Sequence, residues 1–239
     1  MLFSYLSWAD FDTSKKKGVN RPFFTYSLLF ICTIALIVSI ALNGWKVEPL
    51  NVNPMIGPSA ATLIRMGAKD SYLIGKRLKI TREALLFDCT KFSSLASSTL
   101  QSVNAHQAWR LLSSTVLHAG LVHYFINMLA LWFVGNAIET SHGIVAAAIL
   151  FLIPAVGGTI LSAIFLPDYI TVGASGGIFG LIGACLSDII MNWKLLFCDF
   201  VTENGKRHRH AMVVVFLVLD IALNCIIGLT PYVDNFTRK

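Results

Sequence analysis

Charged residues are scarce in this sequence. Asp, Glu, Lys and Arg make up only 13% of its 239 residues, whereas hydrophobic residues make up 55%. Side chains this poor in charge cannot cover the surface of a water-soluble globular protein. The composition therefore excludes that class and indicates a protein embedded in a lipid bilayer.

Paired cysteines are lacking as well. The sequence contains five cysteines, none of them in a CxxC spacing: Cys32, Cys89, Cys185, Cys198 and Cys225. Three of the five lie inside long apolar blocks, where a free thiol packs as a small hydrophobic side chain. We therefore expect neither a disulfide framework nor a metal site, and nothing in the sequence implies a cofactor.

Apolar blocks of about 18 to 25 residues are abundant, and each can cross about 30 Å of hydrocarbon as a helix. Because lipid offers the backbone no hydrogen-bond partners, helices are the expected form. The sequence therefore predicts an all-α polytopic transmembrane bundle with five spans, at residues 23–42, 118–139, 144–166, 169–187 and 211–229. The long first loop, residues 43–110, is too charged to span, and an interfacial amphipathic helix or a re-entrant loop fits it best.

Basic residues beside these spans predict their orientation. Residues 1–22 end in a basic cluster and are expected to be cytosolic: Lys15, Lys16, Lys17 and Arg21. Counting crossings from there places the basic loop after the fourth span in the cytosol, so the second and fourth spans begin on the non-cytosolic side. Although the net charge is +6, we expect these residues to contact lipid headgroups and predict no nucleic-acid partner. No feature favours one cellular membrane over another.

The fourth predicted span opens with a glycine-rich run that includes a GxSxG arrangement around Ser175. Glycines at 173 and 177, and at 176 and 180, have the small-xxx-small spacing that lets membrane helices pack closely. Glycines beside a serine can also expose its hydroxyl, and N–H groups at a helix N-terminus can stabilise a developing negative charge. The packing and the catalytic interpretations both remain open from these residues alone.

Polar residues also open the second predicted span. His123 and Asn127 are four residues apart and therefore share one face of a helix, with His118 just before them. A single histidine at this depth is commonly a hydrogen-bonded structural residue, but polar side chains in lipid usually face a bundle interior or a wet cavity. His123 and Asn127 can therefore face one small volume, and by the crossing count His123, Asn127 and Ser175 lie at similar depth.

These residues carry a resemblance to a known family. The string His118-x4-His123-x3-Asn127, followed by Gly173-x-Ser175-Gly176, resembles the signature of the rhomboid family of intramembrane serine proteases. Trp109 and Arg110 resemble the loop-one element of that family, and residues 231–236 resemble the run that opens its last core helix. The resemblance covers about residues 105–236. It implies a rhomboid-like membrane domain over residues 23–236, followed by a divergent tail, residues 237–239.

The resemblance also implies roles for individual residues. Ser175 would be the nucleophile, and His123 and Asn127 would stabilise the oxyanion together with the Ser175 backbone N–H. His118, Gly173 and Gly176 would support the cavity. The expected substrates or clients are single-span transmembrane proteins, whose helices must unwind locally before a peptide bond can be attacked.

One position departs from the family pattern. The resemblance places the catalytic base two residues after Phe236, where this chain has Arg238. We therefore expect the sixth core helix to be missing and this chain to be inactive, because His123 could serve as base only by leaving its oxyanion role. Two hypotheses follow: a truncated product of a protease gene, or a non-catalytic rhomboid-like protein that binds transmembrane clients. A transporter or channel, resting on Asp220 in the last span, is a third alternative.

Overall fold

The structure is a computed structural model that describes residues 21–71, 107–166 and 168–191, together with Val215, Val218, Leu219 and Ala222. The helices are α1 (Phe23–Leu42), α2 (Ala60–Met66), α5 (Arg110–Ser113), α6 (Leu121–Ala130), the π-helical turn η5 (Leu131–Gly135), α7 (Asn136–His142), α8 (Ile144–Phe165) and α9 (Ser175–Met191). Within these residues no β-strand forms, and one isolated bridge pairs Lys69 with Thr171. The all-α prediction is confirmed.

Three helices of the described part are long and apolar enough to cross a membrane: α1, the continuous helix formed by α6, η5 and α7, and α8. The helix α9 is shorter, at 17 residues. It begins at Ser175, not at residue 169, because the preceding residues run as an irregular loop to Gly173, where φ is +126°. His118 likewise lies before the helix, which begins at Leu121. The predicted span 211–229 falls almost wholly outside the described residues.

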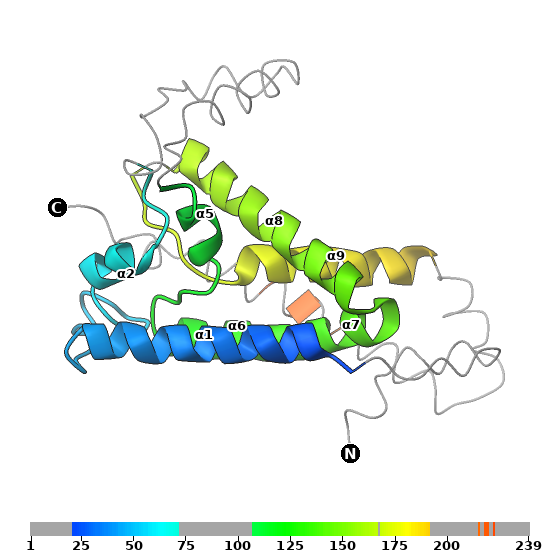
Figure 1. The fold of residues 1–239 in the computed structure, drawn as a ribbon, viewed down its shortest axis with the longest axis horizontal. Helices are drawn as coiled ribbons and strands as arrows, with labels where there is room; N and C mark the ends of the chain where they lie inside the picture. The colour runs from blue at the N-terminus through cyan, green and yellow to red at the C-terminus, as the bar shows by residue number, and fades with distance from the viewer. Residues whose placement is uncertain are drawn as a thin grey trace.

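The first helix lies along the α6–α7 helix, in the opposite direction (Figure 1). Glu139, near the end of α7, is fully buried and accepts hydrogen bonds from the backbone N–H groups of Phe24 and Thr25, at 2.7 and 2.8 Å. The Thr25 hydroxyl donates to the same carboxylate at 2.8 Å. Because the first N–H groups of a helix have no partners within it, this carboxylate caps α1 and fixes its beginning beside the end of α7.

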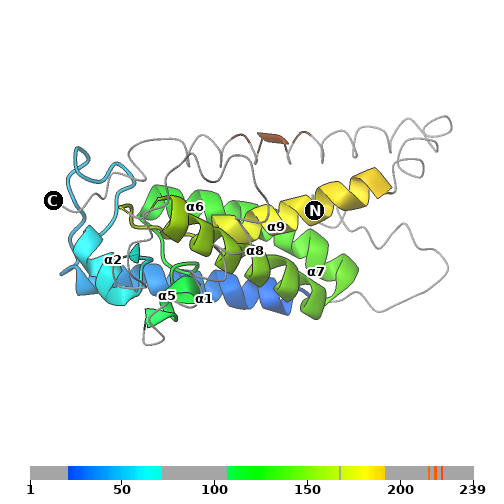
Figure 2. The same ribbon diagram turned by 90° about the horizontal axis from the view of Figure 1, so that it is seen from above.

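Helices α8 and α9 cross each other at close range (Figures 1 and 2). A β-carbon added to Gly180 would lie 2.3 Å from the carbonyl oxygen of Leu150, and one added to Gly177 would lie 2.4 Å from the Phe151 ring. Only hydrogen atoms fit at these two positions. The glycines of α9 therefore do act as packing residues, as one of the two sequence interpretations has it.

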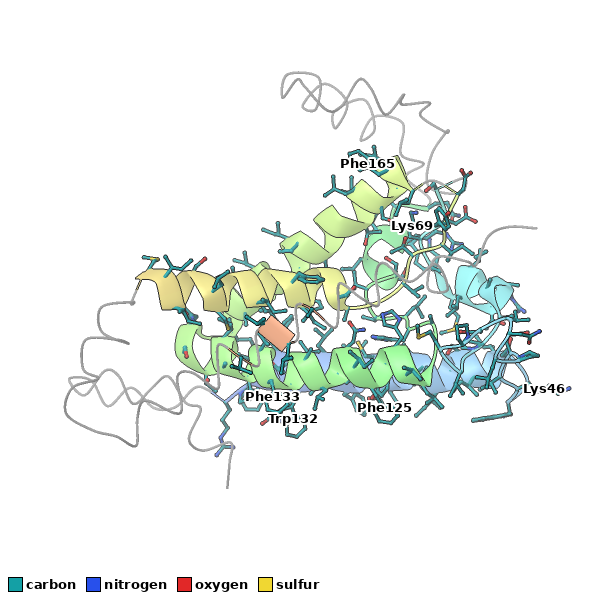
Figure 3. All side chains as sticks on the ribbon, turned by 180° about the vertical axis from the view of Figure 1, so that it is seen from behind. Lys46, Lys69, Phe125, Trp132, Phe133 and Phe165 are labelled. Carbon is teal, nitrogen blue, oxygen red and sulfur yellow. The ribbon has the colours of Figure 1, made fainter. Side chains whose placement is uncertain are left out.

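The outer faces of the helices are apolar. Figure 3 shows Phe125 and Trp132 on the outer side of the α6–η5 segment. Both side chains are exposed, and the Trp132 ring lies beside that of Tyr26 in α1, with centroids 6.2 Å apart. On the inner side, one cluster of buried residues joins α1, α6, α8 and α9, and includes Leu131, Phe151 and Ile178. An apolar exterior around a packed interior is the arrangement expected of helices surrounded by lipid.

A second, smaller core lies at the end of the bundle where α6 and α9 begin. It joins α2, the loop before α6 and the loop between α8 and α9 through five buried residues: Leu63, Ala68, Leu117, Ala119 and Ile170. These loops carry the residues that precede His123 and Ser175 along the chain. The second core therefore sets where the polar residues of the predicted site lie.

Candidate active site

Three polar side chains at the start of the second spanning helix are buried. His118, His123 and Asn127 are 1%, 3% and 1% exposed, respectively. The rings of His118 and His123 meet edge to face, with centroids 5.3 Å apart. One turn further along α6, Asn127 Nδ2 donates to the carbonyl oxygen of His123 at 2.9 Å. The helix thus holds His123 and Asn127 on one inward face, with His118 beside them in the preceding loop.

The loop that leads into α9 lies directly against His123. The backbone N–H of Gly173 donates to the carbonyl oxygen of Ser114 at 2.9 Å, which ties this loop to the segment before α6. A β-carbon added to Gly173 would lie 2.7 Å from His123 Cε1, 2.9 Å from His123 Nε2 and 3.8 Å from Ser175 Oγ. One point next to Gly173 is therefore within reach of both the imidazole edge and the serine hydroxyl.

The hydrogen bond at the other ring nitrogen defines the protonation of His123. The backbone N–H of Ala119 donates to His123 Nδ1 at 3.4 Å, a long hydrogen bond. A backbone amide can only donate, so Nδ1 must accept and carries no proton. The neutral ring then has its proton on Nε2, the ring nitrogen beside Gly173, which makes Nε2 a donor.

Asn127 carries a side-chain oxygen that has no hydrogen-bond partner among the described residues. This atom, Oδ1, is buried. Buried side-chain oxygens in native proteins nearly always have a partner, so an orphaned one needs an explanation. It makes the inner end of the site polar and open to a further donor.

The beginning of α9 adds backbone donors. The helix starts at Ser175, and the first N–H groups of any helix have no acceptors within it. These N–H groups and the positive end of the helix dipole favour a negative charge near Ser175. Taken together, the described residues of the site combine a serine hydroxyl with an imidazole N–H and the backbone donors of a helix end, which can serve as a nucleophile and as oxyanion donors in attack on a carbonyl group, whereas the general base has to come from elsewhere.

A family model described as the Rhomboid domain matches residues 105–238 of this chain. This chain belongs to the rhomboid family. The resemblance inferred from the polar motifs is thereby confirmed, and the buried polar cluster described above lies within the matched residues.

Individual rhomboid relatives extend the match toward the N-terminus. RHOMBOID-like protein 4 of Arabidopsis thaliana is 38% identical over 197 residues, which are 82% of this chain and 40% of that protein. Rhomboid protease GluP of Bacillus subtilis is 44% identical over 202 residues, 84% of this chain and 30% of that protein. Inactive RHOMBOID-like protein 8 of Arabidopsis thaliana is 30% identical over 197 residues, 82% and 45% of the two chains. The chain thus spans less than half the length of each of these rhomboid proteins.

The loop-one residues of the rhomboid motif lie away from Ser175. Arg110 is buried and donates from one guanidinium nitrogen to the carbonyl oxygens of Ile64 and Ala68, at 2.6 and 3.1 Å. Its guanidinium lies over the Trp109 ring, 4.9 Å from the centroid. Burial lowers the pKa of Arg110, and the nearby Asp70 carboxylate opposes that shift. Trp109 and Arg110 therefore secure the end of α2.

Lys69 is a residue that sequence reasoning treated only as one of several charges in the long first loop. It is fully buried beside the end of α8 (Figure 3), and its Nζ donates to the carbonyl oxygens of Leu166 and Tyr169, both at 2.8 Å. Because it is one lysine in a loop rich in basic residues, no sequence signal distinguishes it. The residues 231–236, Arg238 and Asp220 lie outside the described part of the structure.

Proposed function

We propose that this rhomboid-family chain carries the serine site of an intramembrane endopeptidase that cleaves transmembrane segments of membrane proteins. Ser175 is the nucleophile, and His123 and Asn127 are the oxyanion donors. The observation that supports this most strongly is that His123 and Ser175 both border Gly173: a β-carbon added to Gly173 would lie 2.9 Å from His123 Nε2 and 3.8 Å from Ser175 Oγ. The imidazole edge and the serine hydroxyl are therefore near neighbours, as an oxyanion donor and a nucleophile must be.

The proposed reaction is acyl transfer to Ser175. The Ser175 oxygen attacks the peptide carbonyl carbon while its proton passes to a general base, which the resemblance places on the last core helix, and the carbonyl oxygen becomes negatively charged. His123 Nε2–H, the Asn127 amide and the first N–H groups of α9 stabilise that charge. The C–N bond then breaks as the base returns the proton to the leaving amine, which leaves the acyl group on Ser175. Asn127 Nδ2 donates to the His123 carbonyl in the free site, so it shares or exchanges this bond when substrate is bound.

The substrate class follows from the surroundings. The site is polar, lies at the end of an apolar bundle and is surrounded by faces suited to lipid, so a transmembrane helix can approach it laterally. The carbonyl groups of such a helix are already hydrogen-bonded within it. Substrates with glycine or proline near the cleaved bond unwind most easily and are therefore favoured.

The residue at the general-base position supports an alternative function, the binding of transmembrane clients without cleavage. By the resemblance, this position is occupied by Arg238, and a protonated guanidinium cannot accept a proton. This favours a 239-residue chain that binds transmembrane clients without cleaving them. Inactive RHOMBOID-like protein 8 shares 30% identity with this chain, so the relatives of this chain include one named as inactive.

A reporter assay separates these functions. A single-span transmembrane reporter is incubated with the 239-residue chain, with a form extended by the last core helix and histidine of Rhomboid protease GluP, and with a Ser175→Ala version of each. We expect the extended form alone to cleave, and Ser175→Ala to abolish cleavage. Cleavage that persists in Ser175→Ala would contradict the assignment of the nucleophile.

Two other results would favour different conclusions. Cleavage by the 239-residue chain itself would show that His118 or His123 acts as base. Capture of the reporter without cleavage by either form would favour the client-binding alternative.

A further inference from the structure

The segment formed by residues 53–58 presses on the beginning of α6. A β-carbon added to Gly57 would lie 2.0 Å from the carbonyl oxygen of Ala119, and one added to Gly120 would lie 2.2 Å from that of Met55. Two glycines, one on each side, allow this backbone contact. Segment 53–58 therefore touches the residue whose N–H bonds to His123 and the glycine that follows it.

Hydrogen bonds hold this contact in one register. The N–H groups of Leu121 and Val122, which begin α6, donate to the carbonyl oxygens of Ile56 and Met55 at 3.0 and 3.2 Å. Ile56 has a φ of +57°, a conformation that costs a β-branched residue about 1–3 kcal/mol. Such strain persists only where the surroundings fix it, so the position of segment 53–58 on α6 is tightly determined.

Asn53 connects this segment to Ala119 through its side chain. It is fully buried, and its Nδ2 donates to the carbonyl oxygen of Ala119 at 2.9 Å and to that of Pro58 at 3.3 Å. Its Oδ1 accepts from the backbone N–H of Met55 at 3.0 Å. Both N–H donors and one of the two acceptor positions of the oxygen are used, so the orientation of the amide group is determined: the nitrogen faces Ala119 and the oxygen faces Met55.

We propose that Asn53 is a positioning residue for His123: by holding Ala119, it keeps the Ala119 N–H on His123 Nδ1 and thereby keeps the proton of the imidazole on Nε2. This inference deepens the proposed function and rests on it for its catalytic meaning. An imidazole with its proton on Nδ1 would present a lone pair at Nε2 in place of a donor, and that lone pair would repel the oxyanion formed in the attack by Ser175.

Two hydrogen bonds connect Asn53 to His123 through Ala119. Asn53 bonds the carbonyl of Ala119, and the amide of the same residue bonds His123 Nδ1 at 3.4 Å. The 3.4 Å bond is long, so a small movement of Ala119 breaks it. Without it, the two neutral tautomers of His123 differ little in energy and both become populated.

The experiment reads the tautomer directly. The 239-residue chain is produced with ¹⁵N-labelled histidine in detergent micelles, and the ring nitrogens of His123 are assigned by comparison with His123→Gln. In the unmodified chain we expect one tautomer, with Nδ1 unprotonated and Nε2 protonated. In Asn53→Asp, which loses the amide donor and places a carboxylate oxygen against the Ala119 carbonyl, we expect a population with a protonated Nδ1.

A matched control and a milder variant complete the set. Asn43 lies in the same loop, and its Nδ2 donates to the Lys46 carbonyl oxygen, so Asn43→Asp repeats the chemical change without touching Ala119. Its His123 signals should match those of the unmodified chain. Asn53→Ser keeps an acceptor for the Met55 N–H but cannot reach Ala119, so it should also show a population of His123 with a protonated Nδ1. It replaces Asn53→Asp in the test if Asn53→Asp does not fold.

Two outcomes would overturn the inference: a proton on Nδ1 of His123 in the unmodified chain, or an unchanged tautomer in both Asn53 variants. Reporter cleavage by the extended form tests the protease function, whereas the His123 tautomer tests the positioning role of Asn53, so the two can fail separately. A tautomer that follows Asn53 while no form cleaves the reporter would leave the positioning role standing and refute the protease. In a form that cleaves, Asn53→Ser should lower kcat by about 10–100-fold, the range typical of partners that orient a functional histidine.

Discussion

Gly173 is where two residues of the site come together. Its φ of +126° is accessible to glycine and costly for other residues, and its α-carbon faces the His123 ring. We expect Gly173→Ala to lower cleavage by the extended form about 100-fold or more, because the new methyl group would lie 2.7 Å from His123 Cε1 and displace the imidazole. Initial rates on the transmembrane reporter measure this.

The control for Gly173→Ala is Gly157→Ala in α8, where an added β-carbon meets nothing within 4 Å. That variant should cleave at the rate of the parent form. If Gly173→Ala also retained the parent rate, the position of the His123 ring would not matter for cleavage, which would contradict its role as an oxyanion donor.

Some residues of the site could be predicted from the sequence because their relation is local. His123 and Asn127 are one helical turn apart, so any helix places them on one face. Asn53 could not be found this way. Its partner Ala119 is 66 positions away in the chain, and no local periodicity relates the two.

At the scale of helices, the close contact between α8 and α9 depends on Gly180 and not on Gly183. Gly180 faces Leu150 and Pro154 at less than van der Waals distance for any β-carbon, whereas Gly183, one turn further along α9, has nothing within 4 Å. We expect Gly180→Ala to destabilise the bundle by about 1–3 kcal/mol, because the helices must move apart. Gly183→Ala should be neutral or stabilise it by about 0.5–1 kcal/mol through helix propensity.

Unfolding in mixed detergent measures both variants. Equal effects at the two positions would contradict this packing, since the two substitutions differ only in what the new methyl group meets. The spacing of the glycines predicted close packing in general, but only the tertiary structure decides which glycine lies between the helices.

The loop that leads to Ser175 is held by a lysine. Lys69 Nζ bonds two carbonyl groups at the end of α8, and its backbone pairs with Thr171 by hydrogen bonds of 3.1 and 3.2 Å. We expect Lys69→Met to cost about 2 kcal/mol, because it leaves these buried carbonyls without their charged donor while removing the cost of burying the charge. Amide hydrogen exchange at residues 170–174 should become faster.

Lys46→Met is the matched control for this change. Lys46 is exposed after the end of α1, far from Lys69 (Figure 3), so its substitution should alter neither stability nor exchange. Protection of residues 170–174 that is unchanged in Lys69→Met would show that the second core alone holds this loop.

For the whole molecule, the capping of α1 by Glu139 determines which ends share a side of the membrane. The beginning of α1 lies beside the end of α7, so Ser141 and Lys46 are expected on opposite sides. Following the basic residues before α1, we propose that the Ser141 side is cytosolic.

Single cysteines test this arrangement in a background with the five native cysteines replaced by alanine. In right-side-out vesicles, a membrane-impermeant maleimide should label Lys46→Cys at once, and Ser141→Cys only after permeabilisation. The reverse pattern would invert the orientation, and labelling of both from one side would contradict a spanning α1.

The sequence by itself determined the class of this protein. Scarce charge and long apolar blocks leave a helical membrane bundle as the available solution, because the backbone has no other partners in lipid. The local spacing of His118, His123, Asn127 and Ser175 was enough to place it among the rhomboids.

The tertiary structure decided what holds these residues in place. Glu139 caps a helix far from it in the chain, Lys69 bonds the end of α8, and Asn53 holds Ala119. Each is a polar residue whose partner is a backbone group left unpaired at a helix end or in a loop. Such groups become available only once the helices have packed, so the sequence pattern around these three residues carries no sign of their partners.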